Sequence, residues 1–156
     1  GEQNGGRFED DIQAIVDTVR RLHQEKPFDL LHAQYGYPPG LAALQLSREL
    51  GLPNVVSIQG GDGHWVGVSC CGTHQRAIRT VLDHAGAVLI GCQSFADEVI
   101  GHHGTAPERF TLVPGAVDVE RFRPRAGWQA GEWADPAHPT LLYHGRVDRR
   151  KGVLDL

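Results

Sequence analysis

Helical and strand patterns alternate along most of this chain, and this alternation limits the folds open to it. Several segments carry apolar residues at the spacing of one helical face: 8–24, 41–50, 73–84 and 95–102. Short apolar runs that predict strands lie between or after them: 28–32, 54–58, 86–91 and 110–113. Strand–helix–strand units at this spacing favour parallel strands, so we predict an α/β fold with a doubly wound, Rossmann-like parallel sheet.

Residue types at the element ends predict how some of these elements begin and end. Gly51 suits the left-handed residue that closes helix 41–50, and Ser94 suits the N-terminal cap of helix 95–102. The run Gly86–Gly91 shows no polar alternation, which predicts a strand covered on both faces.

Residues 123–139 interrupt the alternation with prolines, tryptophans and no periodicity, and they predict an interdomain linker. Residues 1–122 would then form a partial first domain. Residues 140–156 would begin a second Rossmann-like domain, with a strand at 140–143, a turn and a helix start. Because the ending VLDL stops inside an apolar helical pattern, we expect the sequence to be part of a longer protein.

The start of this second domain carries residues suited to a phosphate. Gly145 follows the predicted strand, and Arg146 and Lys151 flank the turn before the predicted helix. A glycine turn and a helix N-terminus offer backbone N–H groups, while arginine grips phosphate bidentately and lysine adds a point charge. The pair suits a diphosphate. A solvated basic turn is the alternative, because Arg149 and Arg150 lie between the two.

Charge and cysteine usage argue against several functional classes. The net charge of −4 provides no basic field for nucleic acid. No apolar run approaches the roughly 18 residues of a membrane span. The 3 cysteines, Cys70, Cys71 and Cys92, form no disulfide framework, which favours a reducing compartment. The Cys70-Cys71-x-x-His74 run lacks the second ligand pair of a zinc site.

Ligands of parallel α/β sheets bind beyond the carboxyl ends of the strands. In this sequence those ends are residues 32–40, 59–64, 91–94, 114–118 and 144–151.

Stretches around these ends resemble the family 4 retaining glycosyltransferases of two-domain GT-B architecture. The stretches are FDLLHAQYGYPPGLAALQLSRELGLPNVVSIQGGD, then ADEVIGHHG and PERFTLVPGAVDVERFRP, and finally LLYHGRVDRRKGVLDL. They resemble the family's His-x-His to His-Gly-x-Asp passage, its crossover between domains, and its G-R-x-x-x-x-K-G phosphate motif. The resemblance covers residues 28–156.

The resemblance implies transfer of a sugar from a nucleotide-diphosphate-sugar to an acceptor, with retention at the anomeric carbon and no metal or other cofactor. It implies that Arg146 and Lys151, with Gly145, hold the donor diphosphate. The residues facing the acceptor or transferred sugar would be Gln59, Gly60, Gly61, Asp62 and His32. No catalytic residue is assigned.

The partners implied are a nucleotide sugar and a glycan, lipid or small-molecule acceptor, without nucleic acid. The location implied is the cytoplasm, with peripheral contact at the inner membrane face through a preceding region as a further expectation.

The sequence also departs from the family. Gln34 and Gln59 stand where the family has histidines, and neither glutamine carries a proton. The family's acceptor loop and paired donor-sugar glutamates are absent, so we expect this polypeptide alone to be inactive. A nucleotide-sugar 2-epimerase-like enzyme and a non-catalytic sugar- or nucleotide-binding remnant stay open as alternatives. At a strand end such as that of His32 a structural histidine is the commoner outcome, and Asp62 suits an Asx turn and substrate contact equally well.

Overall fold

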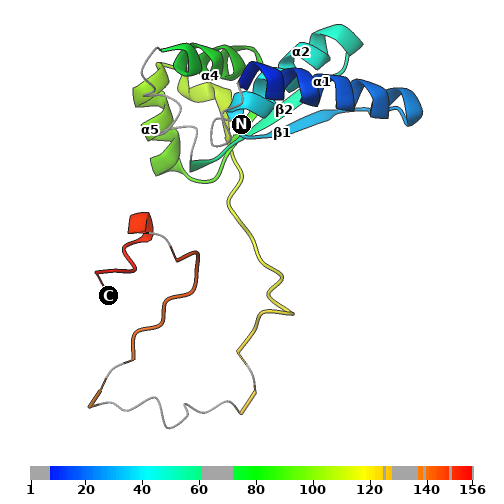
Figure 1. Ribbon diagram of the computed structural model, residues 1–156. Coiled ribbons are helices and arrows are strands. Elements are labelled where there is room, and N and C mark those ends of the chain that lie inside the picture. Colours follow the sequence, from blue (N-terminus) through cyan, green and yellow to red (C-terminus); the bar gives the residue numbers. More distant parts are fainter. Residues whose placement is uncertain are drawn as a thin grey trace. The chain divides into compact units, whose positions relative to one another are not determined.

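The computed structural model describes residues 8–60, 72–124, 126–127, 137–138, 140–147 and 149–155. The chain consists of two compact units, Gly1–Ala116 and Val117–Leu156. The first unit contains the described sheet and the long helices (Figure 1). The domain boundaries expected from the sequence, at 122 and 139, stay predictions.

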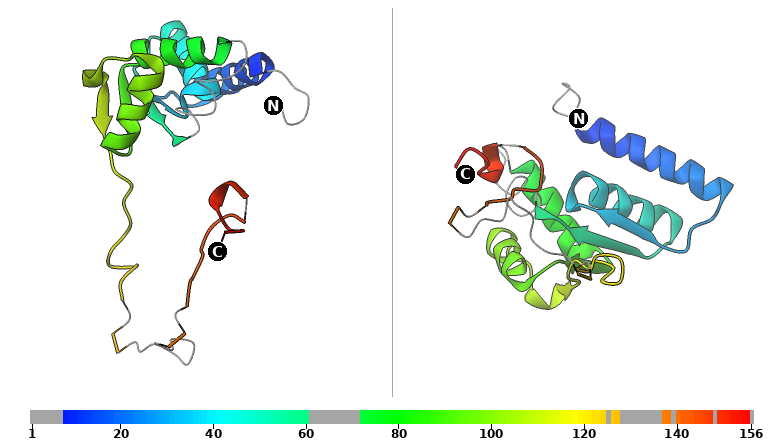
Figure 2. Two further views of the ribbon diagram at one scale, coloured as in Figure 1. Left: turned by 90° about the vertical axis from the view of Figure 1, so that its left-hand side faces the viewer. Right: turned by 90° about the horizontal axis from the view of Figure 1, so that it is seen from below.

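Helices and strands of the first unit follow one another as the alternation predicts. The helices are α1 (Phe8–Glu25), α2 (Leu41–Leu50), α4 (Thr73–His84) and α5 (Gln93–His103). The strands are β1 (Leu31–Gln34), β2 (Asn54–Ile58), β3 (Ala87–Ile90) and β4 (Phe110–Leu112), with short helical turns η2 (Gly36–Gly40) and η3 (Pro107–Arg109). The strands pair in parallel in the order β1-β2-β3-β4 (Figure 2). The predicted α/β class and parallel sheet are confirmed.

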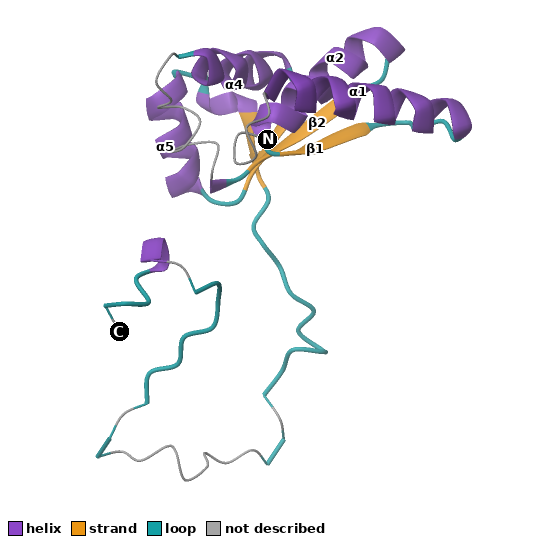
Figure 3. Cartoon of the chain, viewed as in Figure 1, coloured by secondary structure: helices purple, strands orange, loops and turns teal. Residues whose placement is uncertain are grey.

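One face of this sheet is packed against helices. Its alternate residues Val56, Ile58, Val88 and Ile90 are at most 2 % exposed. They share one core cluster with buried residues of α4 and α5, namely Ile78, Val81, Leu82, Ala96 and Val99. Figure 3 shows α2 and α4 on one side of the strands. Helices therefore cover this face of the sheet.

The opposite face is more open in the described part of the chain. His32 and Gln34 of β1 are exposed, and Ser57 of β2 and Leu89 of β3 are half-buried. Successive strand residues point to opposite faces of the sheet. Helices that pack on one face therefore cover only every second side chain of a strand. In β3 the residues on this face, Ala87 and Leu89, are half-buried, so the described residues cover this face of the predicted strand 86–91 only in part.

Several predicted boundaries differ by one to three residues, and the structure shows the cause at the starts of β1 and α5. Strand β1 begins at Leu31 rather than at Phe28, because the Phe28 N–H bonds His23 Nδ1 at 3.0 Å and its ring packs on that imidazole. The N-cap of α5 is Cys92, whose backbone is extended (φ −159°), so Ser94 lies inside the first turn. Gly51, by contrast, closes α2 in the left-handed conformation with φ 69°, as predicted.

Helix α1 is joined to α2 by packing and by charge. Val16 of α1 is fully buried with Leu31, Ala42 and Leu46. The Arg20 guanidinium bonds both carboxylate oxygens of Glu49, at 2.5 and 2.9 Å. These bonds hold the pKa of Glu49 below its usual range. Exposed pairs of this kind contribute little, so the apolar contact carries most of the attachment.

The start of β3 is held to β2 by a polar contact that leaves no room for a side chain. Asn54 Nδ2 donates to Ser47 Oγ at 2.8 Å, and the Gly86 N–H donates to Asn54 Oδ1 at 3.3 Å. A Cβ at Gly86 would lie 2.6 Å from the backbone oxygen of Asn54. Only glycine allows this approach of the two backbones.

We expect Gly86→Ala to lower the free energy of unfolding by about 1–3 kcal/mol, because the added methyl must displace backbone. Urea unfolding followed by circular dichroism measures this. The control is Gly101→Ala in α5, where a Cβ meets nothing within 4 Å. That change should be neutral or stabilising by up to about 1 kcal/mol. Equal destabilisation by both would contradict the close approach.

The second unit differs from its prediction. In the described part of the chain, residues 140–147 form no strand, and residues 149–151 form a short 3₁₀ turn, η4, instead of a helix start. Leu141 and Leu142 are 77 % and 90 % exposed. A strand gains its hydrogen bonds from a neighbouring strand, and the strand pairings of the described sheet, which join β1 to β4, do not include residues 141–147. Asp118 forms a turn, in which its carboxylate accepts hydrogen bonds from the N–H groups of Glu120 and Arg121.

Candidate functional site

Polar side chains gather at the carboxyl ends of β1 and β2 in the first unit. His32 and Gln34 are alternate residues of β1, on its exposed face. Ser57 lies beside Gln34 in the register of the two strands, and Gln59 directly follows β2. The local sequence explains this placement, because the intervening residues Ala33 and Ile58 enter the core.

These four side chains form one network of contacts. His32 Nε2 lies 2.8 Å from Ser57 Oγ and 3.4 Å from Gln34 Nε2. Gln59 Nε2 donates to Gln34 Oε1 at 3.1 Å. The structure thus connects the two predicted residues His32 and Gln59 through Gln34, and Ser57 joins the network at His32. Ser57 was missed from the sequence, although it lies two residues before Gln59, the spacing of one face of a strand.

A cavity of about 190 Å³ lies beyond the neighbouring strand ends. Its lining comes from β2, β3 and the segment after β4: Ser57, Ile58, Gln59, Leu89, Ile90, Gly91, Val113 and Gly115. One part of the wall is polar and can bond hydroxyl groups, while the aliphatic side chains can pack against carbon. This is where the strand-end rule places a ligand.

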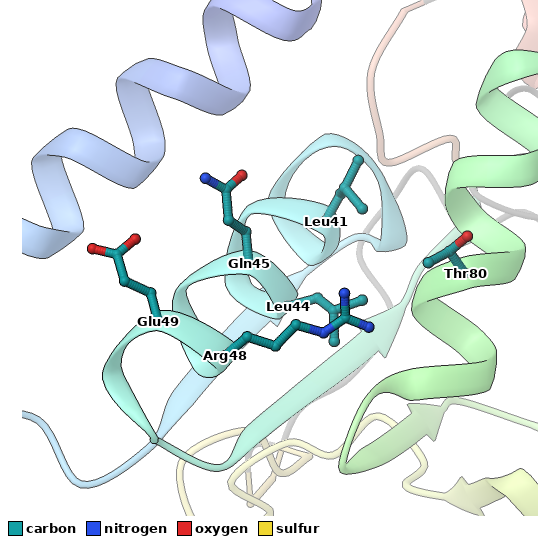
Figure 4. A pocket seen from close by; sticks show the side chains of 6 residues that line it. All are labelled: Leu41, Leu44, Gln45, Arg48, Glu49 and Thr80. Atoms are coloured by element: carbon teal, nitrogen blue, oxygen red, sulfur yellow. The ribbon is translucent and has the colours of Figure 1, made fainter.

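A larger hollow of about 570 Å³ lies elsewhere, between α2 and α4. Figure 4 shows its lining residues, Leu41, Leu44, Gln45, Arg48, Glu49 and Thr80. It opens between two helices and contains none of the network residues. The Glu49 carboxylate on its rim is already bonded to Arg20. We therefore place the candidate site at the strand ends despite the smaller volume.

Tyr35, directly after β1, has a backbone conformation that is rare for a side-chain-bearing residue, with φ 78° and ψ 141°. Its N–H bonds Ser57 O at 2.9 Å, and its carbonyl accepts from Gly40 N at 3.1 Å. These bonds hold the strained residue on both sides while its side chain stays half exposed. Strain of this kind concentrates at functional sites, which adds Tyr35 to the candidate site.

We expect Tyr35→Gly to be more stable than Tyr35→Ala by about 1 kcal/mol. Glycine at this position removes roughly 1–3 kcal/mol of backbone strain. Part of this gain in stability is offset because glycine loses more conformational entropy on folding. Both variants lack the ring, so their difference isolates the φ angle, and thermal or urea unfolding of the pair measures it. A glycine variant less stable than the alanine variant would show that Tyr35 is not strained.

Cys92 adjoins the same region, because Gly91 before it lines the cavity. The thiol is exposed, and its pKa is lowered by a hydrogen bond from the Ser94 hydroxyl, with Sγ–Oγ 3.4 Å, and then by the Phe95 N–H. A lowered pKa increases the thiolate fraction. Cys92 is therefore a convenient site for chemical labelling beside the cavity.

The remaining predicted residues of this region are only partly described. Gly60 follows Gln59, and a Cβ there would meet nothing within 4 Å. Gly61 and Asp62 lie outside the described residues, so their roles stay predictions.

The predicted donor residues belong to the second unit. Arg146 and Lys151 are exposed, and in the described part of the chain neither forms an ion pair. Tyr143 Oη donates to Arg146 O at 2.6 Å. A Cβ at Gly145 would come within 2.9 Å of that hydroxyl, so glycine leaves room for the tyrosine. Sequence reasoning missed this role of Tyr143. The diphosphate roles of Gly145, Arg146 and Lys151 stay predictions.

Residues 6–116 match the family described as "Glycosyl transferase 4-like domain". The chain belongs to this glycosyltransferase family. The match spans the described sheet and the network at its strand ends. None of the described helices is long and apolar enough to cross a membrane.

Two curated relatives agree with this assignment. The chain is 30 % identical over 148 residues to D-inositol 3-phosphate glycosyltransferase 1 of Catenulispora acidiphila, covering 86 % of this chain and 34 % of the relative. It is 25 % identical over 150 residues to D-inositol 3-phosphate glycosyltransferase of Mycolicibacterium gilvum, covering 88 % and 33 %. The chain thus spans about a third of the length of these relatives.

Proposed function

We propose that the complete protein transfers a sugar from a nucleotide-diphosphate-sugar to a polyhydroxylated acceptor, with retention at the anomeric carbon. The observation that carries this proposal is the polar network beside a strand-end cavity, within the segment that belongs to the glycosyl transferase 4-like family. The names of the relatives make D-inositol 3-phosphate the first acceptor to test.

The residues of the first unit suit the acceptor or the transferred sugar. Imidazole, hydroxyl and amide groups both donate and accept hydrogen bonds, which matches the hydroxyl groups of a sugar or cyclitol. Leu89 and Val113 offer aliphatic surface to the C–H faces of the ring. His32, Gln59, Gly60, Gly61 and Asp62 keep their proposed acceptor-facing roles.

The second unit would hold the donor. Arg146 and Lys151 supply counter-charge to the diphosphate, and this stabilises the charge that develops on the leaving phosphate as the sugar departs. With these cations in place, we propose that no metal or other cofactor is needed. We propose that the protein acts in the cytoplasm, where it would use a nucleotide sugar as donor. Peripheral contact with the inner face of the membrane is a separate proposal.

The reaction itself is tested with the full-length protein, a panel of nucleotide sugars and D-inositol 3-phosphate. We expect a glycoside whose anomeric configuration, measured by proton NMR, equals that of the donor. An inverted product would refute retention. Binding of nucleotide sugar without turnover would favour the non-catalytic remnant, and a 2-epimerised nucleotide sugar would favour the epimerase-like alternative.

If Arg146 and Lys151 bind the diphosphate, their substitution should affect activity more than that of the neighbouring cations Arg149 and Arg150. In the full-length protein, Arg146→Ala and Lys151→Ala should each lower kcat/KM about ten- to a hundredfold, because a charge-assisted hydrogen bond contributes roughly 1.5–3 kcal/mol. The matched controls are Arg149→Ala and Arg150→Ala on the same turn, which should have little effect. Four similar losses would indicate a diffuse basic patch.

Gln59 is tested by changing its hydrogen-bonding capacity at similar size. Gln59→His should keep kcat/KM within about tenfold, or roughly 1.4 kcal/mol, because imidazole also bonds a sugar hydroxyl. Gln59→Leu should lose more, because a polar hydroxyl would then face an apolar group. A leucine variant as active as the parent protein would remove Gln59 from the site.

A further inference from the structure

The network at the strand ends has a direction, because amide groups have one donating and one accepting end. Gln59 contacts Gln34 through its Nε2, which only donates, so the group it meets is the accepting Oε1 of Gln34. This turns Gln34 Nε2 toward His32 Nε2, at 3.4 Å. The two contacts together are consistent with one orientation of both amides.

The same logic determines the state of the imidazole. With Gln34 Nε2 as a donor, the contact favours a His32 Nε2 that presents its lone pair, which in the neutral imidazole puts the ring proton on Nδ1. The Ser57 hydroxyl, 2.8 Å from the same nitrogen, then donates to it. The 3.4 Å contact is long, so the shorter bond from Ser57 anchors the ring and Gln34 follows the ring.

We infer that Gln34 is a positioning residue that contacts the His32 ring, which Ser57 anchors, and that it sets the orientation of the Gln59 amide at the wall of the strand-end cavity. The consequence for catalysis rests on the proposed function, in which Gln59 meets a sugar or acceptor hydroxyl. Nε2 of Gln59 is directed to Gln34, so the orientation that a ligand encounters is set before the ligand arrives. Preorganisation of this kind lowers the cost of binding.

The arrangement is tested by NMR on the isotope-labelled chain without ligand, at a pH where the imidazole is neutral. We expect the nitrogen shifts of His32 to show the proton on Nδ1. We also expect slow solvent exchange of one Gln59 side-chain amide proton. Gln34→Leu should speed that exchange several-fold and shift the Gln59 amide resonances. The control Gln45→Leu, an exposed glutamine on α2, should change neither signal.

A second variant separates positioning from general disturbance of the surface. Gln34→Glu keeps an acceptor for Gln59 but removes the donor toward His32. The Gln59 exchange should therefore stay slow while the ring proton moves to Nε2, where it can bond the new carboxylate. Unchanged Gln59 signals in Gln34→Leu, or a proton on Nε2 in the unsubstituted chain, would overturn the inference. Unaltered backbone chemical shifts of β3 show that a variant is folded. If Gln34→Leu does not fold, the position of the His32 ring proton in Gln34→Glu tests the inference.

An activity measurement keeps this inference distinct from the proposed function. In the full-length enzyme, Gln34→Leu should raise KM for the acceptor roughly two- to tenfold, with a smaller change in kcat, as for the loss of one hydrogen bond. If the NMR results are as expected but the protein shows no transfer activity, the positioning of Gln59 by Gln34 stands and the proposed sugar transfer is refuted. Transfer activity with an unchanged acceptor KM would refute the positioning role alone.

Discussion

Because successive strand residues point to opposite faces, helix packing on one face of this sheet decides the chemistry of the other. Val56 and Ile58 enter the core against α4, which directs Ser57 to the open face and leaves Gln59 at the end of the strand. Strand β1 repeats the pattern with Ala33 inside and His32 and Gln34 outside. The register that sets Gln34 beside Ser57 then assembles the network. The site is thus a consequence of core packing.

Local patterns predicted much of this fold and less of its site. Helix α4 and strand β2 have the predicted bounds, because long periodic runs and β-branched residues report local preference directly. Ser57 was missed because a serine within a strand indicates nothing by itself; its role depends on the register with β1. Strand 140–143 was predicted from its apolar residues, yet a strand also needs a neighbour, which local sequence does not specify.

The family assignment and the geometry support different parts of the account. Residues 6–116 belong to a glycosyltransferase family, and this segment holds the cavity and the network suited to an acceptor. The residues suited to a donor diphosphate, Arg146 and Lys151, lie in the other unit. In the proposed function, the first unit would bind a polyol acceptor and the second unit the diphosphate of the donor. Of the two proposed binding sites, the acceptor site is the one that the described contacts support most closely.

The central claim is that the acceptor binds at the strand ends of the first unit. Mapping of acceptor binding by NMR tests this location most directly. D-inositol 3-phosphate would be titrated into the labelled chain, and the shift changes of backbone and side-chain amides would be followed. We predict that the changes gather at the strand ends, at Gln34, Gln59, Gly91 and Val113. Changes confined to the larger hollow between α2 and α4, at Gln45, Arg48 and Thr80, or no change at the strand ends, would contradict it.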